Sequence, residues 1–181
     1  LWKVLDREGV PIDLVVGCSG GAIYAGGIAM GADVGFAESL SLTGWGALFE
    51  RVNARAVLRT LLPRLFGYDE RVGLLDDGEI RRMLDVCFRD ATFADCRRPL
   101  FLAATDYATG ARVTLASGRI ADAVRASTAL PILLPPVALG GRLLADGGMS
   151  NPLPIDVALR EGSDVVLAMG FEDASPRVRS L

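Results

Sequence analysis

The pentad Gly17-Cys18-Ser19-Gly20-Gly21 constrains the fold of this chain more than any other segment. It follows the apolar run 12–16, which is typical of a strand buried on both faces, and precedes the small-residue stretch 20–30, which predicts a closely packed helix. A G-x-S-x-G sequence at a strand-to-helix turn indicates a serine exposed on a sharp elbow. Gly17 and Gly21 are the glycines that we expect to leave room there for the backbone and for a substrate.

The pentad alone does not establish that Ser19 is a nucleophile. Glycine-rich strand-to-helix turns also bind phosphate groups, or simply let a helix and a strand pack closely. No G-K-[ST] sequence follows for a nucleotide phosphate, whereas the small neighbours of Ser19 suit access to a nucleophile. Gly20 begins the helix, where the helix dipole favours an oxyanion. We therefore expect the Gly20 N–H to donate to a tetrahedral intermediate formed on Ser19.

The chain contains no histidine, so the usual base for an activated serine is missing. A carboxylate is the main remaining candidate, and Asp146 has the strongest context because two glycines follow it and let another backbone approach. Three rivals are weaker: Asp13 precedes a buried strand, Asp106 begins a turn and Asp122 lies on a polar helix face. An Asp-Gly turn with no catalytic role is the alternative interpretation of Asp146.

The length of 181 residues predicts a single domain over residues 1–181. The chain is apolar, with 51% hydrophobic residues and a mean hydropathy of +0.36. The 19 residues between Asp13 and Asp33 carry no charge, and a membrane span needs about 17–25 residues, so this stretch is long enough to be one. Several glycines interrupt the stretch and acidic residues flank it, so we expect no transmembrane segment.

The net charge of −3 and the isoelectric point near 5.0 argue against a nucleic-acid partner. The three cysteines, Cys18, Cys87 and Cys96, have no C-x-x-C spacing and no histidine to complete a zinc site. We therefore expect neither a disulfide framework nor a metal, and a reducing compartment, the cytoplasm, as the location. Cys18 is interpreted as a packing residue, because an elbow exposes its central residue and turns the neighbour inward.

Strand and helix patterns alternate along the chain, which predicts an α/β fold. The spacing of Ile80, Met83, Leu84, Cys87 and Phe88 predicts an amphipathic helix, with Asp77 as its N-cap. Gly140-Gly141 predicts a hairpin turn that leads into Asp146. Other helices are expected over 1–9, 36–66, 120–125 and 155–160, and strands over 100–105, 112–115, 137–139, 142–145 and 164–169.

Three blocks in order resemble the patatin-like phospholipase family, in the form of a bacterial-type patatin domain. Gly17-Cys18-Ser19-Gly20-Gly21 is similar to its nucleophile elbow, Ala126-Ser127-Thr128-Ala129-Leu130-Pro131 to its A-S-x-x-x-P block, and Asp146-Gly147-Gly148 to its D-G-[GA] block. The resemblance implies a three-layer α/β/α fold with a mostly parallel central sheet. It also implies a lipid acyl hydrolase of the phospholipase A or lysophospholipase type, with Ser19 and Asp146 as a catalytic dyad and no cofactor.

One part of the family pattern is missing. Patatin-like proteins carry a glycine-rich G-G-G-x-[RK]-G loop ahead of their first helix, and this loop would precede Leu1. Because the helical pattern already runs at Leu1, we expect the given sequence to be trimmed at its N-terminus. The loop supplies oxyanion donors in the family, and loss of one such donor costs about 10²–10³ in turnover.

The implied mechanism has Asp146 accept the Ser19 proton as Ser19 attacks an ester, and water then resolves the acyl-enzyme. An acyltransferase with the same dyad and a catalytically silent binding or scaffold module are the alternatives. The partner is thus a lipid or another acyl ester. A face formed by Arg51, Arg55 and Arg59 could contact anionic headgroups at a membrane surface, or be an ordinary solvated helix face.

Overall fold

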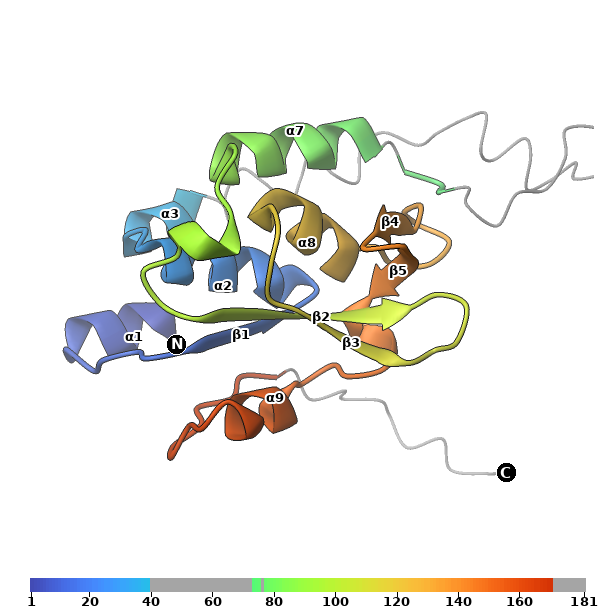
Figure 1. The fold of residues 1–181 in the computed structure, drawn as a ribbon. Coiled ribbons are helices and arrows are strands. Elements are labelled where there is room, and N and C mark those ends of the chain that lie inside the picture. The colour runs from blue at the N-terminus through green and yellow to red at the C-terminus, as the bar shows by residue number, and fades with distance from the viewer. Residues whose placement is uncertain (40–72, 76, 171–181) are drawn as a thin grey trace, which may run out of the picture.

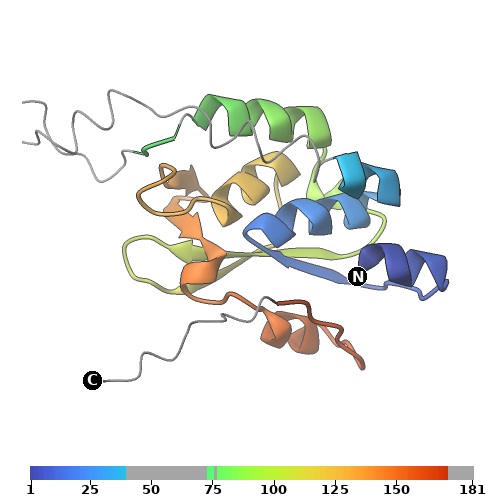
Figure 2. The same ribbon diagram turned by 180° about the vertical axis from the view of Figure 1, so that it is seen from behind.

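The computed structural model describes residues 1–39, 73–75 and 77–170, and in them helices cover both faces of one sheet (Figure 1). The helices α2 (Gly20–Met30), α3 (Val34–Ser39), α7 (Asp77–Phe88) and α8 (Ile120–Ser127) lie on one face. The helix α9 (Ile155–Arg160) lies on the other, and α1 (Trp2–Arg7) stands at the end of the sheet near the N-terminus (Figure 2). This layering confirms the predicted α/β class.

The sheet has five strands: β1 (Val15–Cys18), β2 (Leu100–Asp106), β3 (Arg112–Leu115), β4 (Val137–Leu139) and β5 (Arg142–Asp146). Their order is β1-β2-β5-β4, and β3 also pairs with β2. Only β1 and β2 run parallel among the described strands, whereas the β2–β3, β2–β5 and β4–β5 pairs are antiparallel. The described sheet is therefore mixed and not mostly parallel as expected. Short turns join β2 to β3 and β4 to β5, and strands joined in this way pair in the antiparallel sense.

Local patterns predicted most of the described elements. The helices over 20–30 and 155–160 and the hairpin over 137–146 form where expected, and Gly140 (φ 59°) and Gly141 (φ 75°) both have the positive φ of a type I′ turn. Asp77 differs from its predicted role as a cap, because it is the first residue of α7 and its carboxylate pairs with Arg81 and Arg125. The predicted helix over 36–66, with its arginine face, falls largely outside the described residues.

The predicted strand over 164–169 is wrong. This segment has no regular structure, and the side chains of Val165, Leu167 and Met169 are 79%, 59% and 63% exposed. It lies beside β1, since Val16 and Val165 line the same groove, but it bonds to no described strand. An extended segment becomes a strand only when a neighbour satisfies its backbone N–H and C=O groups, and periodicity alone cannot supply that neighbour.

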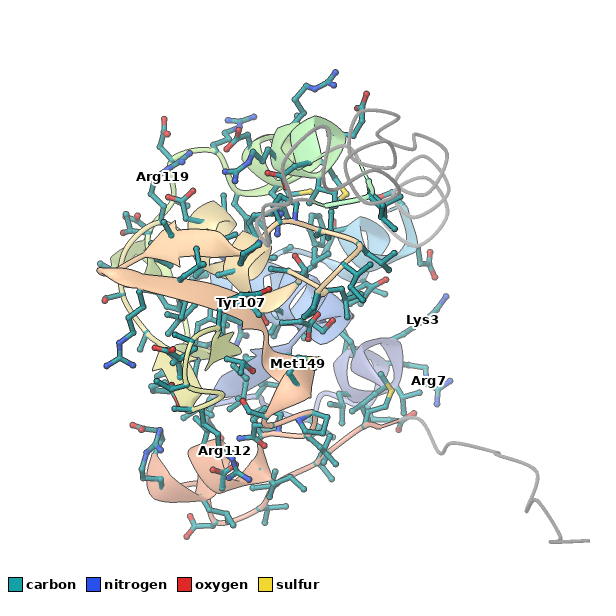
Figure 3. The ribbon with its side chains drawn as sticks, turned by 90° about the vertical axis from the view of Figure 1, so that its right-hand side faces the viewer. Lys3, Arg7, Tyr107, Arg112, Arg119 and Met149 are labelled. Carbon is teal, nitrogen blue, oxygen red and sulfur yellow. The ribbon has the colours of Figure 1, made fainter. Side chains whose placement is uncertain are left out.

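Small residues let α2 lie close to its neighbours. A Cβ added to Gly26 would stand 2.8 Å from the ring of Phe88 on α7, and one added to Gly27 would stand 2.5 Å from the ring of Phe36 on α3. On the opposite face of the sheet, Arg112 on β3 pairs with Asp156 on α9 at 3.5 Å (Figure 3). Within the described residues, no helix has the length and apolar character to cross a membrane.

Candidate active site

Ser19 occupies a sharp turn between the end of β1 at Cys18 and the start of α2 at Gly20. Its backbone has φ 53° and ψ −129°, a region that residues with a Cβ rarely adopt. Such a conformation costs about 1–3 kcal/mol and persists only where the surroundings hold it in place. The turn is thus sharp and strained, and Ser19 stands at its centre.

The two elbow glycines differ in their surroundings. A Cβ on Gly17 would lie 2.7 Å from both the Cα of Ala22 and the Cβ of Ala25, so β1 and α2 can approach this closely only because residue 17 has no side chain. A Cβ on Gly21 would meet no atom within 4 Å. The sequence predicts that both glycines leave room for the backbone. Of the two, only Gly17 stands where a side chain would clash with α2.

Asp146 is the last residue of β5, and its carboxylate contacts the Ser19 hydroxyl. The Ser19 Oγ donates a hydrogen bond to Asp146 Oδ2 at 2.6 Å, and the backbone N–H of Gly148 donates to Oδ1 at 2.7 Å. Asp146 is only 1% exposed. Burial raises the pKa of this carboxyl above its ordinary value, and the hydrogen bonds from Ser19 and Gly148 oppose that rise. The carboxylate is thus a stronger base than a solvated one.

The backbone around Asp146 is held on both sides. Thr105 Oγ1 on β2 donates to the Asp146 carbonyl at 2.8 Å, and the Asp146 N–H donates to the carbonyl of Ala129 at 2.9 Å. A Cβ on Gly147 would collide with the Ala103 carbonyl, so the residue after Asp146 must be glycine for the turn to reach β2. The contact with Ala103 explains why a glycine directly follows the aspartate.

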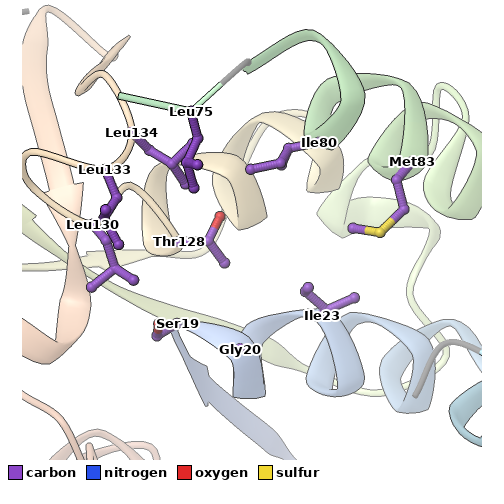
Figure 4. A pocket seen from close by; sticks show the side chains of 10 residues that line it. All are labelled: Ser19, Gly20, Ile23, Leu75, Ile80, Met83, Thr128, Leu130, Leu133 and Leu134. Carbon is purple, nitrogen blue, oxygen red and sulfur yellow. The ribbon is translucent and has the colours of Figure 1, made fainter. Parts of the chain in front are cut away.

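A cavity of about 80 Å³ opens beside Ser19, between α2 and α7 (Figure 4). Ser19, Gly20 and Ile23 line it from the side of α2. Its remaining walls are apolar apart from one threonine: Leu75, Ile80, Met83, Thr128, Leu130, Leu133 and Leu134. In the described part of the chain the Gly20 N–H makes no hydrogen bond to the protein, so it can donate to a group bound there.

The rival groups are engaged elsewhere or unreactive. Asp13 is exposed at the far end of β1, Asp106 accepts the N–H groups of its own turn, and Asp122 pairs with Arg119. Burial, followed by the charge of Asp146, raises the pKa of the Cys18 thiol to about 12, so this thiol stays protonated near neutral pH. The described residues contain no group of three ligating side chains that could hold a metal ion.

Sequence reasoning missed Ser127. This serine is the last residue of α8, is fully buried, and accepts the backbone N–H of Ser19 at 2.9 Å. It stands in the segment 126–131, but nothing in its spacing assigns it a contact. A buried hydroxyl needs a hydrogen-bond partner, and only the fold shows which one it has.

The fold and the site together define a class of protein: an α/β/α domain with a serine on a strand-to-helix elbow that contacts a buried aspartate, in a chain without histidine. Residues 1–159 match the family model described as patatin-like phospholipase. The chain belongs to the patatin-like phospholipase family.

Curated relatives agree with this assignment. The chain is 32% identical over 169 residues to patatin-like phospholipase domain-containing protein 6 of Homo sapiens, which covers 92% of this chain and 12% of that protein. It is 28% identical over 173 residues to an uncharacterised NTE family protein of Mycobacterium tuberculosis, which covers 93% of this chain and 27% of that protein. The chain thus spans only a minor part of these relatives. Membership supports a lipid hydrolase function at the level of the family.

Proposed function

We propose that this chain is a serine acyl hydrolase that cleaves carboxylic esters of lipids, of the phospholipase A or lysophospholipase type. The observation that carries the proposal is the 2.6 Å hydrogen bond from Ser19 Oγ to the buried Asp146, next to an apolar cavity. A hydroxyl that donates to a carboxylate can be deprotonated as it attacks, and no histidine is then required.

In the first step, Ser19 Oγ attacks the ester carbonyl carbon while its proton passes to Asp146 Oδ2. The carbonyl oxygen becomes an oxyanion near the Gly20 N–H, at the positive end of the α2 dipole. Collapse of the tetrahedral intermediate breaks the bond to the alcohol oxygen, which takes the proton from Asp146. The alcohol part of the lipid leaves, and the acyl group stays on Ser19.

In the second step, water attacks the acyl carbonyl and gives a proton to Asp146. Collapse of this intermediate releases the carboxylic acid, and the proton returns from Asp146 to Ser19 Oγ. The raised pKa of the buried Asp146 supports both transfers, because a carboxylate with a higher pKa accepts a proton more readily.

The cavity supports an acyl chain as the bound group. Ile23, Ile80 and Met83 present hydrocarbon and thioether surface beyond Ser19, so an acyl chain that enters would leave water without leaving polar groups unpaired. A phosphate or a charged headgroup would find no charged partner among the residues that line this cavity.

A lipid surface is consistent with the residues next to the cavity. Ile132 is 72% exposed and lies between Leu130 and Leu133, which line the cavity, so this segment can contact lipid at the entrance. The three cysteines in the described residues are free, which supports a reducing compartment such as the cytoplasm. We therefore propose peripheral contact with a membrane on its cytoplasmic side.

Fluorophosphonate labelling of the intact protein tests the proposal. The parent should label, Ser19→Ala should not, and Ser117→Ala, which removes an exposed hydroxyl, should label like the parent. A panel of esters with increasing acyl length then identifies the substrate class. Labelling that survives Ser19→Ala, or hydrolysis restricted to short acyl chains, would contradict a lipid hydrolase that uses Ser19.

A further inference from the structure

The hydroxyl of Ser127 joins three parts of the fold that are distant in sequence. It accepts a hydrogen bond from the Ser19 backbone N–H at 2.9 Å and donates its own proton to the Ala103 carbonyl on β2 at 2.6 Å. Ser127 is fully buried, so water does not compete for either bond. One side chain at the end of α8 therefore connects the elbow to the central strand.

The register of the sheet explains what this bridge replaces. The β1–β2 ladder begins with the Val15 N–H donating to the Pro99 carbonyl at 3.0 Å. In a parallel ladder such bonds recur every two residues, so the same series reaches the Ser19 N–H and the Ala103 carbonyl. In the structure these two groups do not pair directly. The Ser127 hydroxyl stands between them and completes the bond in two steps.

This insertion has a consequence for the direction of Ser19. If Ser19 continued the ladder, its N–H would lie against β2 and its backbone would be extended. With the hydroxyl inserted, the chain leaves β2 one residue earlier and adopts φ 53°, and Ser19 Oγ reaches Asp146 Oδ2. The segment that follows Ser127 also holds the other partner, because the Ala129 carbonyl accepts the Asp146 N–H.

We propose that Ser127 is a positioning residue for the hydrolysis: its hydroxyl replaces the last ladder bond of β1 and so sets the orientation of the nucleophile. The inference rests on the proposed function of Ser19. Ser127 does not line the cavity, so it acts through Ser19 and not on the substrate. Its loss should lower kcat and leave KM nearly unchanged.

Ser127→Ala in the intact protein tests this role. The variant should hydrolyse the best ester of the panel with kcat lowered about 100-fold, the effect of a misplacement of about 1 Å, and with KM within about twofold of the parent. The rate of fluorophosphonate labelling, normalised to the folded fraction from circular dichroism, should fall by a similar factor. Val157→Ala, at a buried position on α9 across the sheet, controls for a general loss of stability. It should leave the normalised rate unchanged.

Ser127→Cys is the second variant, for the case that Ser127→Ala does not fold. A thiol is a weak donor and acceptor, so the normalised labelling rate should fall about tenfold. An unchanged normalised rate in the folded variant, or a loss that appears only in KM, overturns the positioning role. The proposed function fails separately: if Ser19→Ala still labels, Ser19 is not the nucleophile. If Ser19→Ala loses labelling but the folded Ser127 variants label at the parental rate, only the role of Ser127 is overturned.

Discussion

Gly17→Ala tests whether the elbow depends on the close approach of β1 and α2. The new methyl group would stand 2.7 Å from the Ala22 Cα and the Ala25 Cβ, and 3.0 Å from the Gly21 carbonyl oxygen. None of these atoms can rotate away, because two belong to the backbone and one is a Cβ. To restore an ordinary contact of 3.4 Å, α2 would have to retreat by roughly 0.7 Å.

The expected effects follow from that displacement. Overpacking of this kind costs about 1–3 kcal/mol of unfolding free energy, and about 2–4 °C of Tm accompany each kcal/mol in a chain of this size. Because α2 begins directly after Ser19, its retreat also lengthens the Ser19–Asp146 hydrogen bond from 2.6 Å. A misplacement near 1 Å costs about 100-fold, so we expect the kcat of ester hydrolysis to fall roughly tenfold to 100-fold.

Thermal unfolding followed by circular dichroism measures the first effect, and ester hydrolysis at a temperature well below Tm measures the second. Gly21→Ala is the matched control, since its methyl group would enter open space on the same helix. It should be neutral or raise stability by up to about 1 kcal/mol, because alanine has the higher helix propensity. A Gly17→Ala variant with parental Tm and kcat, or an equally damaging Gly21→Ala, would refute the steric argument.

The remaining predictions concern Asp146, Cys18 and the Asp77–Arg125 ion pair. Asp146→Asn should abolish turnover yet raise stability at neutral pH. Burial raises the folded-state pKa of Asp146. The parent therefore loses stability as the pH rises from the ordinary carboxyl pKa near 4 through the folded-state pKa, whereas an asparagine has no proton to lose. For the same reason, the acid limb of the parent's pH–kcat profile should lie above pH 4. Iodoacetamide should modify Cys18 slowly at pH 8 in the folded protein, as judged by peptide mass spectrometry, because its thiol has a pKa near 12; rapid alkylation would contradict this. Asp77→Asn should lower the unfolding free energy by about 3–5 kcal/mol, because it leaves the buried Arg125 guanidinium without its carboxylate. Arg125→Met should lower it by less. Urea titration compares the two variants, and the opposite order would be inconsistent with a buried ion pair.

The sequence predicted best the elements whose cause is local. The apolar spacing in 77–88 requires one buried helix face, and Ile80, Leu84 and Phe88 are buried on α7 as that pattern demands. Likewise, Gly140 and Gly141 specify their hairpin, because their positive φ values set both the turn and the register of its strands.

The errors concern elements whose cause lies elsewhere in the chain. The segment 164–169 has the apolar composition of a strand, but a strand also needs a neighbour at ladder distance, and no local pattern encodes one. The direction of β5 against β2 was misjudged for a similar reason. The family resemblance implied a mostly parallel sheet, whereas β2 and β5, which are distant in the sequence, pair antiparallel.

At the candidate site, the sequence by itself determined the elbow: Gly17 allows the close approach, and Ser19 stands between strand and helix. The absence of histidine made a carboxylate the main candidate for the proposed base. Only the tertiary structure decided that Asp146 is the carboxylate in contact and that Ser127 holds the Ser19 N–H. The physical reason is separation along the chain. A turn depends on the φ and ψ angles of adjacent residues, whereas these contacts join residues more than one hundred positions apart and exist only after β1, β5 and α8 have packed together.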